Sequence, residues 1–377
     1  MFWTVAAALS LLIWIYLLFA RGGFWRVGPA PPGNIRSARR VVAVVPARNE
    51  ADVIGEALTS LFTQHFVAPL QVVLVDDGST DGTADVARVT AGKMGREKDL
   101  TILTGAPLPD GWTGKLWAVS QGTREALQQQ PDYLLFTDAD VRHDGRNVAD
   151  LIAKIEAEDL DLASFMVRLS TKNFAEKALI PAFVYFFLQL YPPAWISAPD
   201  KKTAGAAGGC ILLRPSSLAR IGGHAAIRGQ IIDDCALARA VKSSGGKIWM
   251  GLTANTQSIR PYNGFAEIGR MISRSAFNQL QHSAWLLIGT LLGLALTYVV
   301  PLAALFSGDR IAEYLGGAAW LLMSISYARM IRFYGLPLPW AFALPFVAIF
   351  YAAATFHSAL QYWRGKGGVW KGRVQDA

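Results

Sequence analysis

The chain has 377 residues with a formal net charge of +8, and 52% of its residues are hydrophobic, a share that predicts a part inside a membrane. Its two cysteines, Cys210 and Cys235, form no CxxC pair and have no histidine cluster beside them, which argues against a zinc site and a disulfide framework. The excess basic charge mostly flanks apolar stretches, so membrane topology explains it better than nucleic-acid binding.

The N-terminal stretch from Phe2 to Ala20 has no charged residue and is long enough to cross a bilayer. Five arginines follow it, at Arg21, Arg26, Arg36, Arg39 and Arg40. By the positive-inside rule, they place the N-terminus outside and the following chain in the cytoplasm. A cleaved signal peptide is the alternative, but its basic residues would precede the apolar stretch. We therefore predict a transmembrane anchor at residues 1–20 and a basic linker at 21–40.

From residue 41 the pattern predicts an α/β domain that extends to residue 282. The run VVAVVP is typical of a strand buried on both faces, and residues 49–60 then follow helical spacing. The stretch LQVVLVDDGSTDGT and the residues after it repeat the order of strand, glycine-rich turn and helix. Such units predict parallel strands whose loops gather at the carboxyl ends, where open α/β sheets bind ligands.

Acidic residues follow two of these predicted strands. Asp76 and Asp77 come after the second strand, where either could accept hydrogen bonds from a ribose or a pyrimidine base. A further strand, YLLF, leads to Asp138 and Asp140, which would share one face of an extended segment. A divalent cation between these two carboxylates would relieve their repulsion, and an exposed acidic turn is the alternative. No GxGxxG fingerprint occurs, which argues against a dinucleotide cofactor.

Two more charged features complete the candidate site. Lys115 lies among small residues before a predicted helix, where its ammonium could meet a diphosphate or could be solvated. Asp233 and Asp234 open another predicted helix. They could cap that helix, or a carboxylate fixed there could act as a general base.

Further apolar stretches indicate more contact with the membrane. Residues 178–195 would separate the acidic motifs by the bilayer if they crossed it, so we predict a helix that lies in the interface there. A C-terminal membrane region is predicted at 283–360, with apolar stretches at 283–306, 316–331 and 340–360. Three crossings would leave the basic tail at 361–377 outside, against the positive-inside rule, and three prolines between 336 and 345 allow a broken segment. The number of C-terminal crossings therefore stays open.

The order of the motifs VVPARNE, VVLVDDGSTDGT, GWTGKLWA, LLFTDAD and IIDDCALA resembles that of family 2 glycosyltransferases of the GT-A fold, over about residues 41–262. Within this family, the motif GWTGKLWA, the anchor and the C-terminal hydrophobic hairpins most resemble those of the hopanoid-associated (hopene-associated) glycosyltransferases. Ceramide glucosyltransferase-like enzymes are the neighbouring group. This resemblance implies a nucleotide-diphospho-sugar transferase domain with a Rossmann-like mixed sheet, and transmembrane helices at both ends of the chain.

The resemblance also implies roles for single residues. The nucleotide pocket would be lined by Pro46, Arg48, Glu50, Asp76 and Asp77. Lys115 would approach the diphosphate, Asp138 would reach the ribose or the metal, and Asp140 would ligate the metal. Asp234 would be the catalytic base, with Asp233 beside it.

One departure from the family concerns the number of sugars transferred. Processive relatives carry a Gln-x-x-Arg-Trp motif after the base, and here only Arg270 or Arg274 could match its arginine. We take Arg274 as the substrate-binding candidate. The missing motif favours the transfer of a single sugar.

The resulting hypothesis is a multi-pass enzyme of the bacterial cytoplasmic membrane whose catalytic domain faces the cytoplasm. It would use Mg²⁺ or Mn²⁺ and a nucleotide sugar, with a UDP-sugar favoured over a GDP-sugar, and a hopanoid or related isoprenoid lipid as acceptor. A polyprenyl phosphate is the rival acceptor. From other classes, a nucleotidyltransferase that makes sugar nucleotides and a non-catalytic membrane scaffold remain as alternatives.

Overall fold

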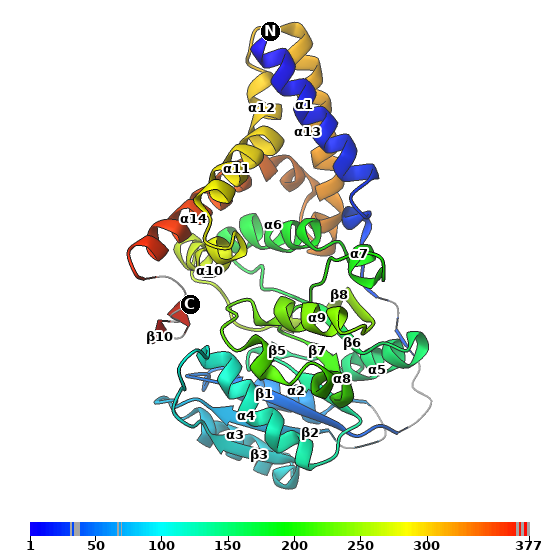
Figure 1. Cartoon of the computed structure of the whole chain (residues 1–377), viewed down its shortest axis with the longest axis vertical. Helices are drawn as coiled ribbons and strands as arrows, with labels where there is room; N and C mark the ends of the chain where they lie inside the picture. Colours follow the sequence, from blue (N-terminus) through cyan, green and yellow to red (C-terminus); the bar gives the residue numbers. More distant parts are fainter. Residues whose placement is uncertain are drawn as a thin grey trace. The chain divides into compact units, whose positions relative to one another are not determined.

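The computed structural model describes residues 1–30, 32–33, 38–65, 68, 70–366, 369–370 and 373–374. Arg36 and Lys371 of the predicted basic segments lie outside them. The chain forms two compact units, whose elements are labelled in Figure 1. The helical unit comprises Met1–Val27, Thr171–Ala194 and Pro261–Gly368, and the α/β unit comprises Gly28–Ser170, Trp195–Arg260 and Val369–Ala377.

The α/β unit is built on an eight-stranded mixed sheet, which confirms the predicted fold class. Its strands are β1 (Val41–Ala47), β2 (Gln71–Asp76), β3 (Leu100–Thr104), β4 (Tyr133–Phe136), β5 (Val141–Arg142), β6 (Leu162–Arg168), β7 (Ile211–Leu213) and β8 (Ile248–Ser258). The strand order is β3-β2-β1-β4-β7-β6-β8-β5. As predicted, β1 runs parallel to β2 and β4, whereas β7 is antiparallel to both of its neighbours. The carboxyl ends of β1, β2 and β4 therefore lie at one edge of the sheet.

The helices of this unit follow the predicted alternation with strands. They are α2 (Ile54–Phe62), α3 (Thr83–Lys93), α4 (Gly114–Gln128), α5 (Asn147–Glu158), α8 (Pro215–Arg220) and α9 (Asp233–Ser243), with short 3-10 helices η2 (Glu97–Asp99) and η3 (His224–Ile227). All seven residues of β1 are buried, in agreement with its continuous apolar run. Helix α4 lies so close to the sheet that a Cβ atom on Gly122 would be 2.6 Å from Val44 Cγ1. Glycine at this position lets α4 approach the strands that carry the site.

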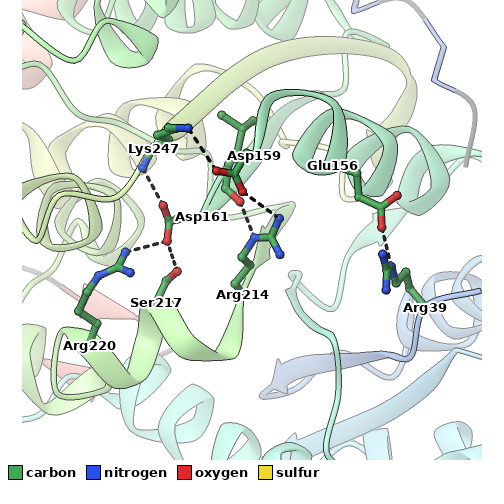
Figure 2. A network of polar contacts seen from close by, with 9 residues as sticks. Arg39, Glu156, Asp159, Asp161, Arg214, Ser217, Arg220 and Lys247 are labelled. Atoms are coloured by element: carbon green, nitrogen blue, oxygen red, sulfur yellow. Dashed lines mark hydrogen bonds and ion pairs between the residues drawn. The ribbon is translucent and has the colours of Figure 1, made fainter. Parts of the chain in front are cut away.

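A network of ion pairs and hydrogen bonds lies at the end of the sheet where β6 and β8 begin (Figure 2). Asp161, just before β6, accepts hydrogen bonds from Ser217, from Arg220 and from the backbone of Lys247, which precedes β8. Burial raises the pKa of Asp161, but these bonds outweigh it and hold the pKa below its ordinary value. Since β6 runs parallel to β8 and, through β7, to β4, this edge is opposite to the carboxyl end of β4. We therefore regard the network as structural.

The helical unit contains most of the long apolar helices. Its elements are α1 (Phe2–Phe19), η1 (Phe24–Arg26), α6 (Phe174–Leu190), α10 (Phe265–Gln279), α11 (Ala284–Leu294), the π-helix η4 (Ala295–Val299), α12 (Val300–Ala304), α13 (Arg310–Phe333), η5 (Leu338–Ala343) and α14 (Leu344–Trp363). The short helix α7 (Pro193–Ser197) spans the unit boundary, and β9 (Val369–Trp370) pairs with β10 (Arg373–Val374).

Within the described part of the chain, four helical segments are long and apolar enough to cross a membrane: Phe2–Phe19, Phe174–Ser197, Ala284–Ala304 and Leu338–Trp363. Three of them coincide with predicted crossings. The segment Phe174–Ser197 contains the stretch predicted to lie in the interface, and its length and composition also suit a crossing. The stretch 316–331, counted above as a crossing, lies inside α13, which is not among the four.

The two units also divide the chain differently from the predicted domain at 41–282. Helices α6 and α10 belong to the helical unit because α6 packs against α13 and α14, and α10 packs against α14 and α6. The Tyr185 hydroxyl of α6 lies 2.6 Å from that of Ser326 on α13, and Ser273 of α10 donates to the backbone carbonyl of Ala354 on α14 at 3.0 Å. An interfacial position for α6 stays a prediction.

Candidate active site

The acidic motif after β4 lies in a turn. The strand ends at Phe136, and a backbone bond from Val141 to Asp138 closes the turn before β5. The alternation expected for an extended segment therefore does not apply to Asp138 and Asp140. Burial, and then the charge of Asp138, raise the pKa of Asp140, so the two carboxylates still act on each other electrostatically.

Lys115 connects this turn to the later acidic pair. It lies in the first turn of α4, and its Nζ atom is 2.6 Å from Asp138 Oδ1. Burial lowers the pKa of Lys115, but the charges of Asp138, Asp233 and Asp234 outweigh burial and leave it above its ordinary value. Lys115 is therefore a partly exposed cation that is paired with Asp138 and feels the charges of Asp233 and Asp234.

Asp234 is fixed at the start of α9 by the backbone. Its Oδ2 atom accepts from Gly208 N at 2.9 Å, and its Oδ1 atom accepts from Cys235 N at 2.7 Å. Burial, followed by the charge of Asp233, raises the pKa of Asp234 to about 6, although Lys115 and the two backbone bonds oppose the shift. A carboxylate with this pKa is mostly ionised at neutral pH and can still take up a proton, as a general base must.

One cavity joins these groups. It is lined, among others, by Pro46, Lys115, Asp138, Gly208, Asp233 and Asp234. These residues come from β1, the first turn of α4, the loop after β4, the loop before β7 and the start of α9. The predicted base, the predicted diphosphate ligand and one predicted metal ligand therefore meet at the sheet edge that the sequence indicated.

Four of the residues predicted for the nucleotide pocket lie at or just after the carboxyl ends of β1 and β2. Arg48 Nη1 donates to the Asp77 backbone carbonyl and lies 3.8 Å from Asp77 Oδ2. The Asp76 carboxylate instead accepts from Ser79 N at 2.9 Å and holds the turn after β2. Between the two aspartates, Asp77 is the buried one that is paired with a cation. Glu50 is also buried, and its role in binding stays a prediction.

Arg260, at the end of β8, is a cation that the sequence analysis did not single out. Its Nη2 atom contacts Glu50 Oε2, and its Nε atom lies 3.7 Å from Asp140 Oδ2. Asp140 Oδ2 also accepts from the Ser258 hydroxyl at 3.1 Å. Each carboxylate of the Asp138 and Asp140 pair thus has its own cationic neighbour.

A metal-binding role depends on the donor set around this pair. Among the residues that the structure describes, no group of three or more His, Cys, Asp or Glu side chains is arranged to hold a metal ion. Asp138 and Asp140 alone suit a hard cation that is bound by one or two carboxylates and completes its shell with substrate phosphates and water. The donor set therefore fits Mg²⁺ or Mn²⁺ bound together with a nucleotide sugar, and it does not form an all-protein cage.

The two candidates for the arginine of the processive motif belong to the helical unit. Arg270 and Arg274 are exposed on α10, in the helical unit. Their match to the arginine of the processive motif stays a prediction.

An α/β unit with a mixed sheet, and with a basic residue and acidic loops gathered at the carboxyl ends of its strands, has the architecture of the GT-A fold. The model of "Glycosyl transferase family 2" matches residues 42–222 of this chain. The curated 4,4'-diaponeurosporenoate glycosyltransferase of Staphylococcus aureus (strain USA300) is similar, with 26% identity over 298 residues, which cover 78% of this chain and 71% of that protein.

A solved structure has a similar fold. It is the mannosyltransferase PcManGT from Pyrobaculum calidifontis in complex with GDP-Man and Mn²⁺, at 18% identity and a TM-score of 0.57. The alignment covers 94% of this chain and 99% of that chain. At this identity the likeness supports the fold and assigns no substrate.

Proposed function

We propose that this protein is a membrane-bound inverting glycosyltransferase that moves a single sugar from a nucleotide-diphosphate sugar to a lipid acceptor. The observation that carries the proposal is the arrangement of Asp234 and Lys115 at one cavity with Asp138. A buried carboxylate with a raised pKa suits proton removal, and a cation beside it suits a diphosphate leaving group.

In the proposed reaction, the acceptor hydroxyl oxygen attacks the anomeric carbon of the sugar while Asp234 takes the hydroxyl proton. The bond from the anomeric carbon to the diphosphate breaks, and the nucleoside diphosphate leaves with the electron pair. Lys115 stabilises the charge that develops on this leaving group. Attack on the face opposite to the leaving group inverts the anomeric centre.

Asp140, with Asp138, would hold the divalent cation, which supplies charge compensation for the diphosphate when it is bound. Arg48 and Asp77 would form the base and ribose side of the pocket. We propose a UDP-sugar as donor ahead of a GDP-sugar. Because the structural relative is a complex with GDP-Man, both nucleotides belong in the test.

The membrane setting supports a lipid acceptor, which we propose to be a hopanoid or related isoprenoid lipid. Four helical segments in the described part of the chain are long and apolar enough to cross a bilayer, so membrane lipids would be the most accessible acceptors. We place the α/β unit on the cytoplasmic side of the bacterial inner membrane, because basic residues follow the N-terminal apolar helix. A polyprenyl phosphate is the rival acceptor, and its ionised oxygen would need no base.

The test is release of nucleoside diphosphate by the detergent-purified full chain, with Mg²⁺ or Mn²⁺, over a panel of UDP- and GDP-sugars with membrane lipid extract. We expect release that needs lipid and that Asp140→Ala and Asp234→Ala abolish without unfolding the protein. Asp85→Ala is the matched control, because this aspartate is 79% exposed on α3, outside the cavity. Pyrophosphate release from a nucleoside triphosphate and a sugar phosphate would instead support the nucleotidyltransferase. Absence of both release and nucleotide binding would support the scaffold.

A further inference from the structure

His224 is a buried residue of the cavity for which neither the motifs nor the proposed mechanism provides a role. It begins η3, directly after Gly222 and Gly223, and its side chain is only 4% exposed. The imidazole lines the same cavity as Lys115 and Asp234. The histidine therefore belongs to the wall of the candidate active site.

The hydrogen bonds of His224 leave one of its ring nitrogens without a partner. Thr123 donates its hydroxyl hydrogen to the Val119 carbonyl at 2.7 Å, and its oxygen lies 3.1 Å from His224 Nε2. Since this threonine has a single hydrogen to give, we assign the ring hydrogen to Nε2, which donates to Thr123. Nδ1 then carries a lone pair, and no described residue donates a hydrogen bond to it.

A second buried histidine, His143, allows the hydrogen bonds of the two imidazole rings to be compared. His143 is also 4% exposed, but both of its ring nitrogens have partners. Its Nε2 atom lies 2.8 Å from the Thr137 hydroxyl, and its Nδ1 atom lies 2.9 Å from Asn147 Nδ2. Buried polar atoms in folded proteins are almost always paired, so the unpaired Nδ1 of His224 requires an explanation.

The charge state of His224 narrows the kind of group that can bind there. Burial lowers the pKa of His224 to about 4, so the ring is neutral at pH 7. A neutral ring with hydrogen on Nε2 offers only an acceptor at Nδ1. A hydroxyl can donate to it, whereas an ionised phosphate or carboxylate cannot.

We propose that His224 is a substrate-binding residue whose Nδ1 atom accepts a hydrogen bond from a substrate hydroxyl. The inference rests on the proposed function, and two sources of the hydroxyl fit the chemistry: the sugar of the donor and the alcohol of the lipid acceptor. In both cases the bond orients a reactant next to Asp234, and His224 takes no proton from it.

Two substitutions separate the two ring nitrogens. His224→Gln keeps a donor where Nε2 lies and loses the acceptor at Nδ1, whereas His224→Asn places an amide oxygen where Nδ1 lies and loses the bond to Thr123. We expect His224→Gln to raise the KM of one substrate, either the nucleotide sugar or the lipid, at least tenfold. His224→Asn should bring that KM most of the way back to the wild-type value.

The affected KM identifies the source of the hydroxyl. If the donor sugar provides it, His224→Gln raises the KM of the nucleotide sugar, also for its slow hydrolysis measured without lipid. If the acceptor provides it, only the KM of the lipid rises and hydrolysis is unchanged. His143→Gln is the matched control, and we expect it to lower the melting temperature without a selective change in either KM.

The outcomes keep this inference apart from the proposed function. Failure of the wild-type chain to transfer any sugar would refute the proposed function. An active wild type with a His224→Gln variant of the same KM values would refute the role of Nδ1 only. The role of Nδ1 would also be refuted if His224→Gln and His224→Asn lowered the melting temperature and the rate equally. In that case an ordered water would satisfy Nδ1, and the role of His224 would be structural.

Discussion

The pKa of Asp234 makes a quantitative prediction about the pH dependence of transfer. With a pKa of about 6, the carboxylate is about 90% ionised at pH 7 and about 10% ionised at pH 5. Because only the ionised form can accept the hydroxyl proton, kcat/KM should fall about tenfold between these two values. Lys115 stays protonated over the whole range, so the decrease reports the protonation of carboxylates.

The assay is nucleoside diphosphate release at donor and lipid concentrations below their KM values, from pH 5 to pH 8, with folding checked by thermal denaturation at each pH. Asp234→Asn removes the base and should cost about 10² to 10⁴ in kcat/KM, with no remaining titration near pH 6. Asp233→Asn removes the neighbouring charge and should move the midpoint to lower pH. A flat profile for the wild type, or an Asp234→Asn variant within tenfold of it, would refute the assignment of the base.

Three further changes test other parts of the structure. Lys115→Met keeps the aliphatic stem but removes the cation beside Asp138, so kcat should fall about 10² to 10³-fold in the release assay. Turnover at the wild-type rate would exclude a role of Lys115 in stabilising the leaving group. Chelation with EDTA should stop transfer until Mg²⁺ or Mn²⁺ is restored, and Asp140→Asn should raise the metal concentration needed for half-maximal rate; a metal-independent wild type would contradict this. Gly122→Ala should lower the free energy of unfolding by about 1 to 3 kcal/mol in denaturant titrations, because its Cβ atom would lie 2.6 Å from Val44 Cγ1 and 2.8 Å from Val75 Cγ2. An unchanged midpoint of denaturant unfolding would mean that α4 can shift to accommodate the methyl group.

Local patterns predicted the part of the site that depends on strand ends. The apolar runs of β1, β2 and β4 identified three parallel strands, and parallel strands bring the residues after them to one edge. Lys115 and Asp234 could be placed at helix starts by the change from small or polar residues to helical spacing. The family resemblance then connected features that are about a hundred residues apart.

The remaining contacts depend on long-range packing that no local pattern records. Arg260 and Ser258 reach Asp140 because β8 pairs with β5, more than a hundred residues earlier in the chain. The pairing of Asp138 with Lys115 depends on the turn after β4, which the alternation of an extended strand does not describe. The assignment of α6 to the helical unit depends on its contacts with α13 and α14, since an apolar aromatic helix has the same composition in an interface and in a helix bundle.

The charges around the cavity also predict which class of acceptor is transferred fastest. Lys115 is one cation among three carboxylates, and its Nζ atom is already within 2.6 Å of Asp138. An acceptor that is itself an anion would add a fourth negative charge beside Asp233 and Asp234, and like charges in a partly buried site repel strongly. Asp234 as a base also has a task only if the acceptor has a proton to lose. We therefore expect an isoprenoid alcohol to be glycosylated at least tenfold faster than the matching carboxylate or phosphate, although the curated relative is named for 4,4'-diaponeurosporenoate, a carboxylate. The comparison needs the purified protein and three acceptors that carry an alcohol, a carboxylate or a phosphate on the same isoprenoid chain. Faster glycosylation of an anionic acceptor would mean that the bound nucleotide sugar or metal reverses the sign of the local electrostatic potential.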